Sequence, residues 1–235
     1  MSMDIAVLIP AFNEAERIAD TVAAALAIPG VSRVVVIDDG SEDGTDHIAT
    51  IAGAKVVRMA GQAGKGGALE AGAKRVENAD IVLLLDGDLG ATASQGELLL
   101  APILDGTADM SIAAFPRPEG KAGFGLVKRL AQGGITRYGG AFEATAPLSG
   151  QRALTRECLE LTRPFAAGYG VEVALTIRAL RSGMRLIEVP TTMGHAATGR
   201  NFKGFVHRGR QFVHVALALV RLGAETRRAR RQAKR

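Results

Sequence analysis

The residues best suited to chemistry are two acids that follow an apolar run, in the stretch Leu83-Leu84-Leu85-Asp86-Gly87-Asp88-Leu89-Gly90. Two buried carboxylates one residue apart repel each other, and this repulsion is costly unless a cation offsets it. Hard oxygen ligands suit Mg²⁺ or Mn²⁺. We therefore predict that Asp86 and Asp88 bind a divalent metal ion that acts as a Lewis acid on a leaving diphosphate. The alternative is a loop that only caps a helix.

Two further polar clusters also follow apolar runs, Ile9-Pro10-Ala11-Phe12-Asn13-Glu14 and Val36-Ile37-Asp38-Asp39-Gly40-Ser41-Glu42-Asp43-Gly44-Thr45. A carboxylate at a strand end can accept hydrogen bonds from the N–H of a uracil ring or from ribose hydroxyls. We predict this role for Glu14 and Asp39. For Ser41 and Asp43, shaping a turn and capping the next helix is the favoured role. The candidates for nucleotide contact are Pro10, Ala11, Glu14, Asp39, Gly40, Ser41, Lys65, Asp86 and Gly87.

A glycine-rich stretch, Gly61-Gln62-Ala63-Gly64-Lys65-Gly66-Gly67, could bind phosphate. Glycines let backbone N–H groups approach phosphate at the start of a helix, and Lys65 would supply positive charge. The stretch is not a Walker A loop, because Gly66 stands where that motif needs Ser or Thr. A plain glycine-rich turn is an equally good interpretation.

The second half of the chain offers a glutamate and flexible backbone. Gly168-Tyr169-Gly170 leaves the backbone free to lie against a sugar, and Glu172 opens the helix that we expect at Val171–Arg181. An acid there lies at the favourable end of the helix dipole. Glu172 could hold sugar hydroxyls or act as a base, and the alternative is a simple first-turn acid. We place Tyr169 among the candidates for acceptor contact.

His195 follows the strand that we expect at Leu186–Val189, and a neutral imidazole there could complete the metal shell. A lone histidine is more often structural, and His47, His207 and His214 are given no special role. Arg200 and Lys203 could clamp an acceptor phosphate, the arginine through two parallel hydrogen bonds.

These residues need a sheet to position them. Continuous apolar runs separated by helix-length segments indicate a parallel sheet covered on both faces, and such sheets bind ligands beyond the carboxyl ends of their strands. The expected class is α/β, a mostly parallel sheet flanked by helices. Pro10 is expected to stop the first strand. The expected strands are Ile5–Ile9, Val34–Ile37, Lys55–Arg58, Ile81–Leu85, Met110–Phe115 and Leu186–Val189; the expected helices include Glu14–Leu26, Gly67–Val76, Leu126–Leu130 and Thr155–Leu161.

Composition narrows the class of protein. The 235 residues are 47% hydrophobic but only 4% aromatic, which suits a closely packed α/β protein and argues against a disordered one. The apolar runs are shorter than the ~20 residues of a membrane span, and no signal peptide is visible. The single cysteine, Cys158, excludes an intramolecular disulfide. These features predict a cytoplasmic protein.

Positive charge gathers at the C-terminal end. Residues 208–235 hold nine of the 29 Lys and Arg residues but one of the 24 Asp and Glu residues, so the rest of the chain is slightly acidic. The apolar segment 212–222 could pack on the body of the protein, on a second subunit or on a membrane surface. We favour packing on protein, with a mobile tail over Arg227–Arg235. A homodimer and peripheral contact with the inner membrane face stay open, and nucleic-acid binding is the disfavoured non-catalytic alternative.

In this order, the stretches Pro10-Ala11-Phe12-Asn13-Glu14, Asp38-Asp39-Gly40-Ser41 and Asp86-Gly87-Asp88 resemble family 2 glycosyltransferases of the glycosyltransferase-A fold. The resemblance covers residues 4–205. The stretch from Pro164 to Glu172, with Gly64-Lys65-Gly66 and Pro147-Leu148-Ser149-Gly150, is similar to glucosyl-3-phosphoglycerate synthases. The strand Leu186–Pro190 and the basic end are similar to polyprenyl-phosphate sugar synthases.

The resemblance implies a site. It implies uridine contacts at Pro10, Glu14 and Asp39, diphosphate contact at Lys65, and a metal ion at Asp88 and His195. The acceptor would lie near Ser149, Gly150, Arg200 and Asn201. The expected catalytic residues are therefore Asp88, Glu172 and Lys65.

The expected function is metal-dependent transfer of a hexose, glucose from UDP-glucose, to a phosphorylated acceptor such as 3-phosphoglycerate, with transfer to polyprenyl phosphate as the alternative. The expected catalytic domain is 1–205, with a nucleotide-sugar half (1–115) and an acceptor half (116–205), followed by a C-terminal helix and basic tail (206–235). A nucleotidyltransferase is disfavoured because residues 10–17 lack a glycine-rich loop with Arg and Lys.

Overall fold

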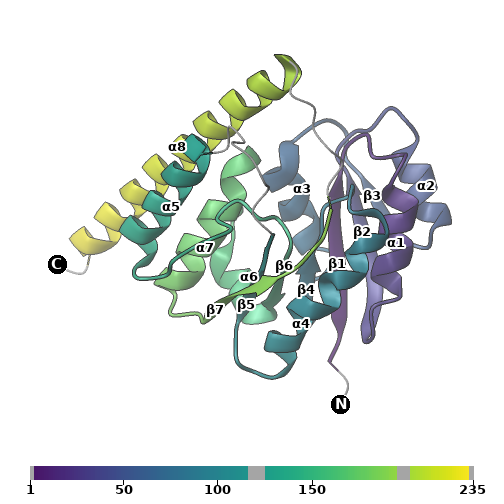
Figure 1. Cartoon of the computed structure of the whole chain (residues 1–235), viewed down its shortest axis with the longest axis horizontal. Coiled ribbons are helices and arrows are strands. Elements are labelled where there is room, and N and C mark those ends of the chain that lie inside the picture. Colours follow the sequence, from purple (N-terminus) through teal and green to yellow (C-terminus); the bar gives the residue numbers. More distant parts are fainter. Residues whose placement is uncertain (1–2, 116–124, 195–201, 233–235) are drawn as a thin grey trace.

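The computed structural model describes residues 3–115, 125–194 and 202–232, without the side chains of 202–208, 210 and 229–232. Within these residues a seven-stranded sheet has the order β3-β2-β1-β4-β6-β5-β7 (Figure 1). Only β6 runs against its neighbours β4 and β5, while the other pairs are parallel. The mostly parallel α/β sheet expected from the sequence is therefore confirmed. The strands are β1 (Ile5–Ala11), β2 (Val31–Asp38), β3 (Lys55–Arg58), β4 (Ile81–Leu84), β5 (Met110–Ala114), β6 (Arg152–Thr155) and β7 (Leu186–Pro190).

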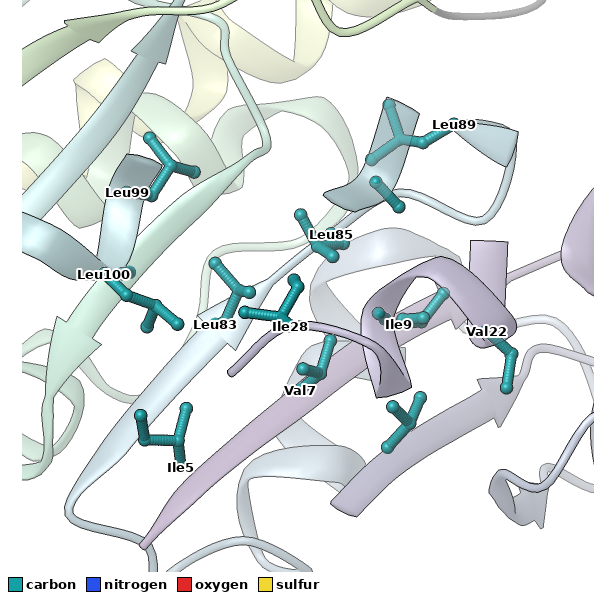
Figure 2. Packing of buried hydrophobic residues seen from close by; sticks show 14 of the residues in the cluster. Ile5, Val7, Ile9, Val22, Ile28, Leu83, Leu85, Leu89, Leu99 and Leu100 are labelled. Atoms are coloured by element: carbon teal, nitrogen blue, oxygen red, sulfur yellow. The ribbon is translucent and has the colours of Figure 1, made fainter. Parts of the chain in front are cut away.

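Helices cover both faces of this sheet (Figure 1). In β1, Ile5, Val7 and Ile9 face a core that includes α1 and α4, and Figure 2 shows this packing. Ala6 and Leu8 face the opposite core, which includes α3, α6 and α7. Burial on both faces explains why the strands are continuous apolar runs. The helices are α1 (Ile18–Leu26), α2 (Thr45–Ile51), α3 (Gly64–Ala73), α4 (Gly96–Leu104), α5 (Gly125–Gly139), α6 (Arg156–Thr162), α7 (Val171–Arg181) and α8 (Phe202–Gln232), with 3₁₀ turns η1 (Gly90–Gln95) and η2 (Gly168–Gly170).

A third core lies outside α7, where α5 and α8 pack side by side (Figure 1). Val215, Leu219 and Leu222 of α8 are buried there against α5 and α7. The preference for packing segment 212–222 on protein is thus confirmed for one face of the helix. In the described part of the chain no helix combines the length and apolar character needed to cross a membrane. The cytoplasmic location and the homodimer stay predictions.

The expectation that Pro10 stops the first strand is wrong, because β1 continues to Ala11 and Pro10 pairs with Ile37. The carbonyl of Leu8 accepts from the N–H of Leu85 on the β4 side. Pro10 is two residues further on, so its backbone also faces the β4 side. The pairing of β1 with β4 has already ended there, at Leu8. The missing N–H of Pro10 therefore removes no ladder hydrogen bond.

Several boundaries also differ. The helix expected from Glu14 begins only at Ile18, because Asn13 has a φ of 56° and residues 14–17 form a turn. Helix α3 begins at Gly64, three residues before the expected start. Strand β6 and helix α4 were not predicted. The expected Lys55–Arg58 and Val171–Arg181 agree with β3 and α7.

The sheet crosses the expected boundary at residue 115, because β5 pairs with β6 and β7 from the following half. The division into a nucleotide-sugar half, an acceptor half and a segment 206–235 stays a prediction. The parallel strands all end at the same edge of the sheet, which is where the polar clusters of the sequence meet.

Candidate active site

A chain of three charged side chains lies at the carboxyl end of β4. The Nζ of Lys65 is 2.6 Å from Oδ1 of Asp86 and 3.0 Å from Oε1 of Glu172. Lys65 is in the first turn of α3 and Glu172 is in the first turn of α7, so two helix starts converge on the end of β4. Burial alone would lower the pKa of Lys65, but the carboxylates of Asp86 and Glu172 outweigh it and raise the pKa. Lys65 is therefore a fixed positive charge at this edge.

The segment 149–151 lies directly against this chain. The Nε2 of Gln151 donates to Oδ2 of Asp86 at 2.7 Å. A Cβ atom on Gly150 would lie only 2.3 Å from Nζ of Lys65 and 3.0 Å from Oδ2 of Asp86. A side chain at position 150 would displace the ammonium group of Lys65, so the structure brings Gly150 together with Lys65, Asp86 and Glu172. Ser149 is buried next to it.

Arg152 holds the same segment, 149–151, in place. The sequence did not predict this role. The side chain is fully buried; its Nε donates to the carbonyl of Ser149 at 2.9 Å and its Nη1 to Oγ1 of Thr176 at 2.8 Å. Burial lowers the pKa of Arg152 to about 10, so the guanidinium still carries its charge at neutral pH. Arg152 therefore ties Ser149 to helix α7, which carries Glu172.

Asp39 has a different setting from the one expected. Its two carboxylate oxygens accept from the backbone N–H groups of Ala63 and Gly64, both at 2.7 Å. In this structure Asp39 therefore holds the start of α3, where phosphate was expected, and its contact with uridine stays a prediction. A carboxylate has four lone-pair sites, so two remain for a ligand.

The favoured structural role of Ser41 and Asp43 agrees with their contacts. Oγ of Ser41 accepts from the N–H of Asn13, and Asp43 accepts from the N–H groups of Ala15 and Thr45. These bonds hold the end of β1 against the turn that follows β2. Gly40, with a φ of 84°, allows that turn.

Glu14 lies close to Gly87, the residue between the two acids. A Cβ atom on Gly87 would be 3.2 Å from Cγ of Glu14 and 3.4 Å from Cβ of Ala11. Burial first, and then the charges of Asp88 and Asp86, raise the pKa of Glu14 to about 7. The structure thus gathers three carboxyl groups, Glu14, Asp86 and Asp88, at the ends of β1 and β4.

The Glu14→Gln variant, treated with a chelator, is expected to melt at a higher temperature than the wild type at pH 8, with little difference at pH 5. The pKa of Glu14 is about 7 in the folded protein against an ordinary value of 4.5. A folded-state pKa raised in this way means that stability is lost as the pH rises from 4.5 through 7. The neutral amide removes that loss. Scanning calorimetry of both proteins at the two pH values measures it.

The matched control is Glu16→Gln, which makes the same change at an exposed neighbour. We expect this variant to melt with the wild type at both pH values. Equal melting temperatures of Glu14→Gln and wild type at pH 8 would contradict the crowding of carboxylates described here.

The donor set suits a hard divalent cation. Both oxygens of Asp86 have partners, in Lys65 and Gln151. The carboxylate of Asp88 lies close enough to Glu14 to help raise the pKa of Glu14. Crowded carboxylates at neutral pH attract a cation, as the raised pKa of Glu14 indicates. Among the described residues no group of three His, Cys, Asp or Glu side chains is placed to hold a metal ion. His195, the expected third ligand, lies outside the described residues, as do Arg200 and Asn201.

The backbone at Gly168–Gly170 is not free, contrary to expectation. A Cβ atom on Gly168 would be 2.2 Å from Nδ1 of His214, and one on Gly170 would be 2.6 Å from Cβ of Ala218. The Tyr169 ring stacks on the His214 ring, with centroids 5.7 Å apart, and the Tyr169 N–H donates to Nδ1 of His214. These glycines therefore serve close packing on α8, and His214 does have a role, in holding the turn before Glu172.

The chain is similar to known glycosyltransferases. A family profile described as "Glycosyl transferase family 2" matches residues 6–160. Glycosyltransferase AglJ of Haloferax volcanii is 36% identical over 197 residues, which are 80% of this chain and 62% of that protein. The chain thus spans about three fifths of the length of that relative. Undecaprenyl-phosphate mannosyltransferase of Micrococcus luteus is 28% identical over 217 residues, which are 85% of this chain and 87% of that protein.

The fold is also similar to solved structures of glucosyl-3-phosphoglycerate synthase from Mycobacterium tuberculosis. The complex with Mg²⁺ and UDP superposes with a TM-score of 0.78 at 26% identity, covering 94% of this chain and 79% of that one. The complex with Mn²⁺, UDP-glucose and phosphoglyceric acid gives 0.76 at 27% identity, with the same coverage. The glycosyltransferase-A fold expected from the sequence is confirmed.

Proposed function

The chain belongs to glycosyl transferase family 2, a family of nucleotide-sugar-dependent glycosyltransferases, and from that premise we propose that it transfers a hexose from a uridine diphosphate sugar to a phosphorylated acceptor. We propose glucose as the hexose and 3-phosphoglycerate as the first acceptor to test. The similar M. tuberculosis protein binds UDP-glucose and phosphoglyceric acid.

One observation carries the proposal. Lys65 lies between Asp86 and Glu172 at the carboxyl edge of the sheet, and Gly150 approaches it closely. Two acids keep the ammonium group charged and fix its position. A preorganised positive charge stabilises negative charge that develops on a leaving group, and this is usually the largest single catalytic contribution. The leaving group that fits such a charge is the diphosphate of UDP.

The other residues take roles around this charge. Glu14 and Asp39 would accept hydrogen bonds from the uridine, and Asp88 would hold the divalent metal ion. When bound, that ion would offset charge on the leaving diphosphate as a Lewis acid. Glu172 is buried and orients Lys65, and its proposed further role is to accept a hydrogen bond from a sugar hydroxyl. Arg152 and Gln151 keep the Ser149–Gly150 turn against the site.

Binding of UDP with Mn²⁺ is expected to raise the melting temperature by about 5–10 °C at a concentration 100-fold above Kd. GDP and ADP should have smaller effects, because Glu14 and Asp39 are proposed to accept from the ring N–H of a uracil, and a larger purine would present its N–H groups at other positions. A thermal-shift panel of UDP, UDP-glucose, GDP and ADP, with and without Mn²⁺, measures this. A larger shift with GDP would contradict the uridine assignment, and equal shifts without metal would contradict the metal.

Polyprenyl phosphate is a second candidate acceptor, favoured by one observation. The undecaprenyl-phosphate mannosyltransferase of M. luteus aligns over 87% of its own length. A lipid phosphate is already ionised at pH 7 and needs little help from a base, whereas a hydroxyl acceptor needs its proton removed. Incubation of the enzyme with UDP-glucose and each acceptor, followed by mass spectrometry of the product, separates the two.

A further inference from the structure

Helix α8 has a second apolar stripe on the side away from the protein. Val213, Leu217 and Val220 recur at the i, i+4 and i+7 spacing of one helix face, and their exposed fractions are 53%, 52% and 64%. The residues that pack inward, such as Val215 and Leu219, lie on the opposite face. Core packing therefore accounts for only one of the two stripes.

Exposed arginines accompany the outward stripe on α8 and are also present on the neighbouring helix α5. Arg221, Arg227 and Arg228 are exposed on α8, and Arg129 and Arg137 are exposed on the neighbouring α5 (Figure 1). By sequence, α5 contains no acid and α8 contains one, Glu225. Glu225 is already paired with Arg178 of α7 at 2.8 Å. The outer layer of α5 and α8 is thus strongly basic.

We infer that the outer face of α8, defined by Val213, Leu217 and Val220, docks on the surface of an anionic lipid bilayer. Apolar side chains beside arginines are the pattern of a helix that lies in the membrane interface. Each Lys or Arg near an anionic leaflet strengthens binding roughly fivefold. The inference is independent of the proposed sugar donor and acceptor.

The positive charge of α5 and α8 also favours an anionic bilayer over a second copy of the chain or a nucleic acid. A second copy would bring the same arginine-rich layer against itself, with no unpaired acid on α5 or α8 among the described residues to balance it. Nucleic acid would satisfy the arginines but leave the apolar stripe in water. An anionic bilayer satisfies both, because its headgroups meet the arginines and its acyl boundary covers Val213, Leu217 and Val220.

A single tryptophan gives a direct test, since the natural chain contains none. The Leu217→Trp variant is expected to show a blue-shifted emission with vesicles of phosphatidylcholine and phosphatidylglycerol at 150 mM salt. The matched control is Ile51→Trp, because Ile51 is 74% exposed and belongs to α2, which lies away from α8 in Figure 1. No shift of Leu217→Trp, or an equal shift of Ile51→Trp, overturns the inference.

Co-sedimentation tests the two parts of the surface separately. Leu217→Glu with Val220→Glu should lower the vesicle-bound fraction at least tenfold, and Ile51→Glu should leave it unchanged. Arg227→Gln with Arg228→Gln should weaken binding roughly 25-fold. Equal binding to pure phosphatidylcholine overturns the inference. So does a dimer in sedimentation equilibrium that Leu217→Glu abolishes, or RNA binding that outcompetes the vesicles.

Discussion

Replacing Asp88 with alanine is expected to lower kcat/KM roughly 10³-fold, the equivalent of about 4 kcal/mol, while the protein stays folded. The loss follows from the proposed role of the carboxylate as a metal ligand. The protein should still fold, because the substitution removes one of the negative charges that repel Glu14 and raise its pKa. Steady-state kinetics with saturating Mn²⁺ measures the loss, and calorimetry measures the fold.

Asp105→Ala is the matched control, since Asp105 is an exposed acid beyond the end of α4. It should keep the activity of the wild type. Electron paramagnetic resonance of Mn²⁺ gives a readout besides activity, and Asp88→Ala should no longer bind the ion. Near-normal turnover of Asp88→Ala, or full activity after complete chelation, would make the metal mechanism wrong.

Gly150→Ala is expected to lower kcat/KM roughly 10²-fold. The new Cβ would lie 2.3 Å from Nζ of Lys65, so the lysine must move away from Asp86 and Glu172. The positive charge would then be misplaced, although the Lys65 side chain is still present. Kinetics of Gly150→Ala, Lys65→Met and the double variant measure this effect.

If Gly150→Ala acts through Lys65, the double variant should be no worse than Lys65→Met alone, since both remove the same interaction. Fully additive losses would show that Gly150 acts in another way. Gly133→Ala in α5 is the matched control, because no atom lies within 4 Å of its added Cβ. This substitution should leave kinetics unchanged and stabilise the protein by up to about 1 kcal/mol.

The parts of the fold that could be predicted from the sequence are those set by local pattern. Strands β1 and β4 are continuous apolar runs, since each is buried on both faces. Strand β6, which begins with Arg152, was missed because its apolar residues are Ala153 and Leu154. Strand β3 is equally short and also begins with a charged residue, but it carries two β-branched valines. Arg152 can be buried only because Ser149 and Thr176, the second of them 24 residues away, accept its hydrogen bonds. No local window contains this information.

The same distinction holds for the candidate site. The sequence predicted Lys65, Asp86 and Glu172 one by one from their strand and helix ends, and the structure brings them together. It could not predict that Asp39 would hold the start of α3, because the bonds to Ala63 and Gly64 span more than 20 residues. The stretch Gly168-Tyr169-Gly170 was misinterpreted for a related reason. Its close neighbour, His214, comes from a helix far along the chain.

The strand order also determines when each strand can find its sheet neighbours during synthesis. Strands β1 to β4 can pair with one another as they leave the ribosome, but both sheet neighbours of β5 come later in the sequence. Thr155, the end of β6, follows Ala114 by about 40 residues, a wait of roughly 2–8 s at 5–20 residues per second. For that time Met110 and Ile112, which end fully covered, have no strand to join. The nascent chain therefore passes through an interval in which apolar residues of β5 have no strand partner, and unpaired apolar segments of this kind are prone to aggregation.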